Sequence, residues 1–330
     1  MPAWALFLLS GALVVAAGTV LSHYGDAIAA RTGLGGVWVG AILVAAATSL
    51  PELSTNLYAV RQGHRSLAVG DLFGANMTNM LILALLDLSV RHGRVLTRVA
   101  INQALVGALA VALTAAAAAG VLAGERLSLG PLGWAPLLIV AGYVSGIRLV
   151  HVTRKNPLFQ TEAEAKRAAR EAPPLPRAVV GFVLAALVIL AAARTLAASA
   201  ADLAAQLGIS SGFMGVTLLA VTTTMPELVT SGAAVRAGAY DLAVGNLLGS
   251  NCFNMAMLVA LDLADGHGSL LAQVEPRLAT SALIAILLMG QVLLDILHRA
   301  ERRVWYLEPG PALLILTYAF GLYLTYESGQ

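Results

Sequence analysis

Residues 46–56 read AATSLPELSTN and place a proline and a carboxylate inside an apolar run long enough to cross a membrane. Pro51 has no N–H to donate, and its ring obstructs the carbonyl one turn earlier, around Ala47. Glu52 brings a charge to a depth where insertion costs about 2.5–3.5 kcal/mol. Polar backbone at that depth survives only where it lines a cavity or is buried in protein. The stretch therefore predicts a binding site inside a membrane protein.

The composition of the whole chain agrees with a membrane location. Apolar residues make up 58% of the 330 and charged residues 12%, whereas soluble domains carry about 25% charged residues. Apolar stretches of about twenty residues, the length that spans a bilayer, recur throughout. We therefore expect an all-α polytopic membrane protein with ten transmembrane helices, at 4–23, 35–60, 66–89, 99–123, 131–150, 178–201, 210–236, 241–264, 277–298 and 310–326.

The distribution of basic residues predicts the orientation. The first ten residues contain no lysine or arginine, so we interpret 4–23 as a span rather than a signal peptide. Lysine and arginine accumulate in cytoplasmic loops, and the longest basic segment is 151–177. With ten spans, we expect a multi-pass protein of the cell membrane with this connecting loop in the cytoplasm and both termini extracellular. Cys252 is the only cysteine, so helix packing alone must hold the fold.

The opening stretch has a second copy. Residues 221–231 read VTTTMPELVTS, so Pro226 and Glu227 follow Pro51 and Glu52 by 175 residues. The same offset relates LAVGDLFGANMTNM (67–80) to LAVGNLLGSNCFNM (242–255). Each half then holds five spans, and an odd number inverts the second half in the membrane. The expected divisions are a first half at 1–150 with its repeat at about 41–87, the loop at 151–177, and a second half at 178–330 with its repeat at about 216–262.

Interrupted spans in two inverted halves indicate a substrate site near the middle of the membrane. Glu52 and Glu227 would face each other there and repel, unless a cation or a proton lies between them. A structural ion pair is the alternative, but Arg194 is the only other strong charge well inside a span and cannot pair with both. Ca²⁺ suits the site because it takes six to eight oxygen ligands.

The neighbouring residues can supply those oxygens. The prolines free the carbonyls around Ala47 and Thr222. We expect the nearby hydroxyls to point at the ion rather than back onto their own helices; these are the hydroxyls of Thr48, Ser49, Thr223 and Thr224. Asn79 and Asn254 could either bind the ion or hold another ligand.

Other spacings that the two copies share are less specific. The paired glycines at i, i+4 spacing allow either close helix packing or exposure of backbone to the ion pathway; they are Gly70, Gly74, Gly245 and Gly249. Asp71, whose counterpart is Asn246, is expected near the mouth of the pathway. Asp87 and Asp262 are expected to be solvated caps at the ends of spans.

The segments ATSLPEL with GDLFGANMTN, and VTTTMPEL with GNLLGSNCFN, resemble the two α-repeats of the sodium/calcium exchanger family, within the calcium/cation antiporters. The resemblance implies that sodium and calcium compete for overlapping sites in an alternating-access cycle. It implies ion ligands at Thr48, Ser49, Glu52, Asn79, Thr223, Thr224, Glu227, Ser250 and Asn254. Ala75 stands where the family has a serine, and Asn254 stands where some relatives have an aspartate.

We therefore expect a secondary antiporter that exchanges Ca²⁺ for Na⁺, and not an enzyme. A Ca²⁺/H⁺ or other cation/proton antiporter of the same fold is the alternative, because the same glutamates could load protons. A channel would need a continuous pore, and an intramembrane enzyme would need a nucleophile or a metal-bound water. The expected partners are membrane lipid and the transported Ca²⁺ and Na⁺, with no cofactor and no nucleic acid, and a monomer suffices for the two halves.

Overall fold

The computed structural model describes residues 2–32, 48–90, 95–99, 102–124, 128–129, 132–153, 172–236, 238, 240–298 and 309–327. These residues are nearly all helical, with one short hairpin. The elements are α1 (Ala3–Thr32), α3 (Leu50–Arg61), α4 (Arg65–Ser89), η1 (Leu96–Arg98), α5 (Asn102–Ala123), β1 (Ser128–Leu129), β2 (Leu132–Gly133), α6 (Trp134–Thr153), α8 (Leu175–Leu207), α9 (Ser211–Met214), η2 (Gly215–Leu219), α10 (Ala220–Thr223), α11 (Met225–Arg236), α12 (Tyr240–Ala256), α13 (Leu258–Asp265), η3 (Leu270–Gln273), α14 (Leu278–His298) and α15 (Pro309–Glu327).

Helices occupy every span that the sequence predicts, although the second, 35–60, is described only from residue 48 on. Within the described ranges, six helical units are long and apolar enough to cross a membrane: α1, α4, α5, α8, α12 with α13, and α14. A seventh is the pair Ser211–Thr223 and Met225–Arg236, which bends by 45°. The predicted polytopic helical membrane protein is confirmed, and one of the two predicted helix breaks is seen as a bend.

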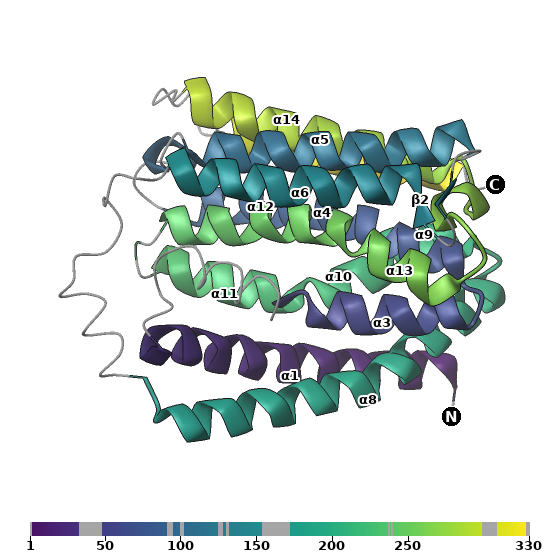
Figure 1. Ribbon diagram of the computed structural model, residues 1–330, viewed down its shortest axis with the longest axis horizontal. Helices are drawn as coiled ribbons and strands as arrows, with labels where there is room; N and C mark the ends of the chain where they lie inside the picture. The colour runs from purple at the N-terminus through teal and green to yellow at the C-terminus, as the bar shows by residue number, and fades with distance from the viewer. Residues whose placement is uncertain are drawn as a thin grey trace.

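The helices lie side by side along one direction (Figure 1). The long helices α1 and α8 pack along each other at one edge of the bundle, and α14 packs along α5 toward the opposite edge. Helix α4 lies between them, with 89% of its most apolar window buried, against 28% for α8. The first repeat therefore contributes the central helix of the protein.

The two halves use the same turn after each broken span. Gly63 joins α3 to α4 with a φ of 81°, and Gly238 joins α11 to α12 with a φ of 77°. Gly63 donates its N–H to the carbonyl of Val60 at 2.9 Å, and Gly238 donates to Val235 at 3.0 Å. Glycine is the residue that adopts this left-handed conformation without a steric cost. Both pairs are related by the repeat offset of 175 residues.

The two prolines begin new helices inside the bundle. Pro51 lies in the first turn of α3 and Pro226 in the first turn of α11, the positions where a missing N–H costs nothing. Helix α1 covers both breaks: a Cβ added at Gly18 would lie 2.5 Å from Pro226 Cγ and 3.6 Å from Pro51 Cγ. The breaks thus lie close together although they are far apart in the sequence.

Close helix packing accounts for two of the four predicted glycines. A Cβ at Gly70 would lie 2.4 Å from the carbonyl oxygen of Gly212, and one at Gly74 would lie 2.4 Å from that of Val216. Helix α4 therefore approaches the backbone of α9 and the π-helical segment η2 directly, as small residues permit. This close approach brings the first repeat against the broken span of the second.

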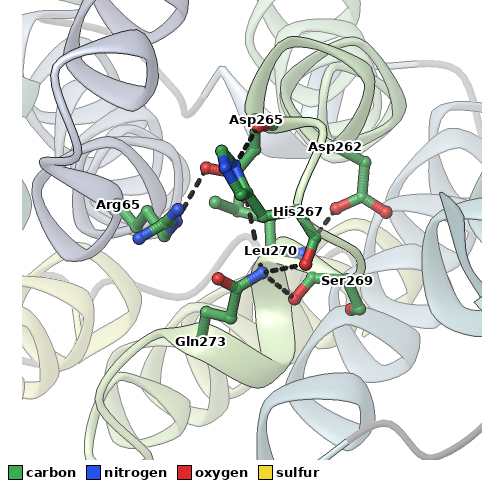
Figure 2. A network of polar contacts seen from close by, with 7 residues as sticks. All are labelled: Arg65, Asp262, Asp265, His267, Ser269, Leu270 and Gln273. Atoms are coloured by element: carbon green, nitrogen blue, oxygen red, sulfur yellow. Dashed lines mark hydrogen bonds and ion pairs between the residues drawn. The ribbon is translucent and has the colours of Figure 1, made fainter. Parts of the chain in front are cut away.

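A polar cluster joins the two halves at one end of the bundle (Figure 2). Arg65, at the start of α4, donates from Nε to Oδ1 of Asp265, at the end of α13, at 2.7 Å. Gln273 donates from Nε2 to Asp265 Oδ2 at 3.4 Å and to the Ser269 carbonyl at 3.1 Å. His267 Nδ1 lies 3.8 Å from Asp265 Oδ2. The Asp265 side chain is 1% exposed and the Arg65 side chain 28%, so the carboxylate of this ion pair is shielded from solvent while the guanidinium is partly exposed.

Asp87 and Asp262 are not the solvated caps expected from the sequence. Asp87 is 1% exposed and Asp262 is fully buried. Asp87 accepts the N–H of Leu96 at 3.3 Å, whereas Asp262 accepts the N–H groups of Leu270 and Gly133 at 2.8 and 2.9 Å. Both carboxylates hold loop backbone whose N–H groups would otherwise be buried without partners.

Candidate ion-binding site

Two buried carboxylates define the site. Glu52 and Glu227 fall in the first turns of α3 and α11 and are 1% and 0% exposed. A helix N-terminus stabilises negative charge, which helps each carboxylate at this depth. The two lie close enough for their charges to interact, and Glu52 also interacts with Asp71. Among the described residues, Oε2 of each glutamate has no hydrogen-bond donor.

The structure gives no support to a structural ion pair for these glutamates. The ion pairs found in the described part of the chain join Arg65 and His267 to Asp265, and Arg277 to Glu275. Arg194, the one other strong charge expected within a span, is exposed on α8. No basic side chain that the structure describes therefore compensates the two buried charges.

Hydroxyl oxygens from both halves surround the carboxylate of Glu227. Ser49 Oγ lies 3.4 Å and Ser250 Oγ 3.5 Å from Glu227 Oε1, and the two hydroxyl oxygens lie 3.5 Å apart. The Thr48 hydroxyl also hydrogen-bonds to Glu227. Hydroxyl hydrogen bonds usually measure about 2.7–2.8 Å. Oxygens held at right angles about 2.4 Å from a cation lie about 3.4 Å apart, so this triangle has the dimensions of a ligand shell.

Four asparagines form a network of mutual hydrogen bonds next to the glutamates. Asn76 and Asn251 each donate to the other's backbone carbonyl, at 3.5 and 3.3 Å. Asn79 Nδ2 donates to Asn251 Oδ1 at 2.8 Å. Asn254 Nδ2 donates to Asn76 Oδ1 at 3.1 Å. The amide nitrogens of Asn79 and Asn254 are thus engaged, while their Oδ1 atoms are buried without a donor in the described structure and are free to bind a cation.

The threonine hydroxyls are oriented differently from the sequence prediction. Thr222 and Thr224 donate to carbonyls of their own helix, at 2.7 and 2.8 Å. The single hydroxyl proton of Thr223 has three acceptors at 3.2 Å, namely the carbonyls of Leu219 and Ala220 in its own helix and Oδ1 of Asp71. Back-bonding of this kind is the ordinary behaviour of threonine in a helix, so only the lone pairs of their hydroxyl oxygens remain for a cation. Thr222 also turns its methyl group toward Gly11 of α1. Its carbonyl stays a predicted ligand, and Ala47 lies outside the described residues.

Ala75 and Ser250 occupy equivalent positions in α4 and α12, and both are buried. Ser250 places its hydroxyl near Glu227, whereas Ala75 has no hydroxyl to place near Glu52. The two halves of the site are therefore chemically unequal at this position.

Sequence reasoning underestimated a second set of residues at the site. Asp71 is fully buried rather than at the mouth of a pathway, and it accepts hydrogen bonds from Asn56 Nδ2 at 2.6 Å and Thr223 Oγ1 at 3.2 Å. Asn76 and Asn251 were not among the predicted site residues, although both belong to the asparagine hydrogen-bond network. The repeat offset marked all of these positions, because each has a counterpart 175 residues away.

The candidate ligand atoms favour a hard cation. All the candidate ligand atoms are carboxylate, amide or hydroxyl oxygens, which Na⁺ and Ca²⁺ prefer over the nitrogen and sulfur sites of transition metals. Within the described residues, no group of three or more His, Cys, Asp or Glu side chains could hold a metal ion. A cation here would need neutral oxygens in addition to the two glutamates.

Comparison with known proteins gives one consistent result. The family described as "Sodium/calcium exchanger protein" matches residues 2–144 and 177–327. The inner membrane protein YrbG of Escherichia coli is 29% identical over 92% of this chain and 89% of its own length. The putative antiporter CaxA of Alkalimonas amylolytica is 30% identical over 86% of this chain and 89% of its own length.

Solved structures share the fold at low sequence identity. The H⁺/Ca²⁺ exchanger CAX superposes with a TM-score of 0.74 at 16% identity, covering 99% of this chain and 85% of its own. The sodium-calcium exchanger NCX_Mj gives a TM-score of 0.62 at 19% identity, covering 97% and 98%. Exchangers with different coupling ions therefore have this arrangement of helices.

Proposed function

The chain belongs to the sodium/calcium exchanger protein family, and on that premise we propose that it exchanges Ca²⁺ for Na⁺ by alternating access. As a member of a family of exchangers it is a membrane-embedded transporter and not an enzyme. The observation that supports calcium is the pair of buried glutamates, one from each half, with acceptor oxygens that no described residue satisfies.

The charges of the site suit a divalent ion. Two ionised glutamates balance one Ca²⁺, and the same two balance two Na⁺. Taking these charges out of water without compensation would cost several kcal/mol each. Exchange keeps the site occupied in both directions of the cycle, because either ion restores neutrality. Ca²⁺ and Na⁺ compete for the same two carboxylates, and this competition is the physical basis we propose for antiport.

The neutral ligands complete the shell. Ser49, Ser250 and Thr48 supply hydroxyl oxygens beside Glu227, and Asn79 and Asn254 offer free amide oxygens. Ligands come from α3, α4, α11 and α12, so both halves must come together to close the shell. A shift of one half relative to the other would open it, as alternating access requires.

Proton coupling is the second candidate, and Ala75 is the observation that favours it. A sodium site needs several neutral oxygens, and Ala75 removes one hydroxyl that Ser250 provides in the other half. A proton needs no such shell and could neutralise a glutamate directly.

For the orientation, we propose both termini outside the cell membrane and the loop 151–177 in the cytoplasm. The support is the concentration of basic residues in that loop. The single chain supplies ligands from both halves, so we propose that a monomer transports.

Radiolabelled Ca²⁺ uptake into liposomes containing the purified full chain tests the function. We expect an outward Na⁺ gradient to drive uptake, and replacement of internal Na⁺ by choline to abolish it. Liposomes with an imposed pH gradient and no Na⁺ form the second arm. Uptake driven by the pH gradient alone would reject the sodium mechanism in favour of proton coupling.

A further inference from the structure

The repeat is broken at one charged position beside the site. Asp71 in α4 is the counterpart of Asn246 in α12, within otherwise similar segments. Asp71 is fully buried and Asn246 is 7% exposed. One half of the protein thus carries a buried negative charge where the other carries a neutral amide.

The partners of these two residues differ in a matching way. In the second half, Asn246 Nδ2 donates to Ser231 Oγ at 3.1 Å. In the first half, Asn56 stands in the place of Ser231 and donates from Nδ2 to Asp71 Oδ2 at 2.6 Å. Donor and acceptor have exchanged positions, and an ionised carboxylate can only accept. Asp71 therefore accepts a hydrogen bond at the position where Asn246 donates one.

Asp71 also contacts the proposed ion site directly. Thr223 Oγ1, one of the expected ligands, lies 3.2 Å from Asp71 Oδ1. The carboxylate of Glu52 is near enough to interact with the charge of Asp71. Each carboxylate oxygen has two lone pairs, so the bonds from Asn56 and Thr223 leave one on each oxygen available.

The charge of Asp71 has no basic partner in the part of the chain that the structure describes. Nearby acceptor oxygens also lack donors there: Asn56 Oδ1 and Glu52 Oε2 are both buried and unpartnered. A second carboxylate close to Glu52 and an unpartnered amide oxygen are together the kind of acceptor oxygens that a bound cation would satisfy.

From this geometry we propose that Asp71, Asn56 and Thr223 form an additional subsite that binds a monovalent cation, Na⁺, next to the central site. The inference rests on the proposed exchange function and specifies the charge of its loaded state. Three carboxylates, rather than two, then balance the bound cations. Asp71 makes the site accept one more Na⁺ than the two glutamates alone would neutralise.

Substitution Asp71→Asn tests the subsite, because it converts the position to the amide already present at Asn246. Thermal unfolding of the purified full chain, measured over an Na⁺ titration without Ca²⁺, reports binding, since a ligand that binds only the folded state stabilises it. We expect the Na⁺ concentration for half-maximal stabilisation to rise by about tenfold or more in the variant, the loss expected for one charged ligand. The Hill coefficient for Na⁺ should fall, because the number of binding sites sets its upper limit and one site is removed.

Transport separates this inference from the proposed function. In liposomes, we expect the charge moved per Ca²⁺ to change by one in Asp71→Asn. Asp202→Asn, at an exposed position of α8, is the matched control and should leave the Na⁺ curve unchanged.

The outcomes are distinct. Wild-type protein that shows Na⁺-driven uptake, with the same Na⁺ titration and charge per Ca²⁺ in Asp71→Asn, would retain the function and overturn the subsite. Wild-type protein without Na⁺-driven uptake would overturn the proposed function. Na⁺ stabilisation that is lost on Asp71→Asn would still support the subsite in that case. Asn246→Asp, which adds a carboxylate at the equivalent position, should strengthen Na⁺ binding, and weaker binding would count against the charge argument.

Discussion

Asn76 and Asn251 bind each other reciprocally, each donating its side-chain amide to the other's backbone carbonyl. The two residues are 175 positions apart, which is the offset of the repeat. Contacts in which residue i meets j and j meets i are the signature of a two-fold axis. The pseudo-two-fold axis expected from the sequence repeat therefore runs between Asn76 and Asn251, beside the proposed site.

This pairing predicts symmetric effects on stability. Asn76→Ala and Asn251→Ala should each lower the unfolding temperature by a similar amount, corresponding to about 1–3 kcal/mol for the buried groups left unpaired. The double variant should lose less than the sum, because the two residues share partners. Thermal unfolding of the purified protein measures this, with Gln206→Ala on the exposed face of α8 as control. Additive losses would show that the two asparagines act independently.

The glutamates should be indispensable for transport. Glu52→Gln and Glu227→Gln each remove one of two charges that balance Ca²⁺ while keeping the side-chain shape. We expect each variant to fold and insert but to lose Ca²⁺ uptake, by about a hundredfold or more for a lost charge interaction of some 3 kcal/mol. Uptake in liposomes and elution as a single species in gel filtration give the two readouts. Near wild-type flux in either variant would reject the site.

The ion pair at the end of the bundle should stabilise the fold rather than the chemistry. Arg65→Gln leaves the buried Asp265 carboxylate without its cationic partner, so the unfolding temperature should fall, by about 1.5–3 kcal/mol in stability. Combining Arg65→Met with Asp265→Leu should recover part of the loss, because no charge then stays buried. Arg177→Gln at an exposed position is the control. An unchanged unfolding temperature in Arg65→Gln would show that the pair contributes nothing.

Cysteine labelling tests the orientation. In a Cys252→Ala background, a cysteine at Ala163 should react with a membrane-impermeant reagent only from the cytoplasmic face. One at Gly329 should react only from outside. The reason is the concentration of basic residues in the loop 151–177. Reaction of both from the same side would contradict the five spans expected between the two positions.

The sequence was sufficient for the helices and for the glutamates. Apolar length determines which segments can cross a bilayer, and those segments coincide with the helices found. Pro226 identified the broken span that the structure describes, because proline has no N–H to donate, and Pro51 lies in the first turn of α3. The repeat supplied the rest, since identical spacing in two halves placed Glu52 and Glu227 in equivalent first turns.

The predictions that were wrong concern residues whose environment depends largely on contacts between distant segments. The buried Asp262 accepts hydrogen bonds from Gly133 in β2 and Leu270 in η3, two segments that no local sequence pattern places beside it. Asp71 was assigned to a pathway mouth because distance from the span centre was the only guide to depth. The direction of the Thr224 hydroxyl followed from its own helix, which offers a carbonyl at 2.8 Å.

Replacing Ala75 by serine tests which ion is coupled to Ca²⁺ transport. Ser250 places a hydroxyl 3.5 Å from Glu227, and Ala75→Ser would place one at the equivalent position in the first half. Na⁺ depends on neutral oxygens more than Ca²⁺ does, because the carboxylates dominate binding of the divalent ion. We therefore expect Ala75→Ser to lower the Na⁺ concentration for half-maximal Ca²⁺ flux, with Ca²⁺ affinity in the absence of Na⁺ nearly unchanged. Ser250→Ala should shift the Na⁺ curve in the opposite direction.

Ca²⁺ flux over an Na⁺ titration, for the wild type and both variants, measures the effect. Ala75→Gly is the matched control, because it changes the size of the side chain without adding an oxygen. The packing around Ala75 is close, since it is fully buried, so a shift that also appears in the glycine variant would come from packing alone. An Na⁺ curve that stays in place in Ala75→Ser, with flux that follows only a pH gradient, would mean that protons drive the exchange and that the missing hydroxyl has no ion to bind.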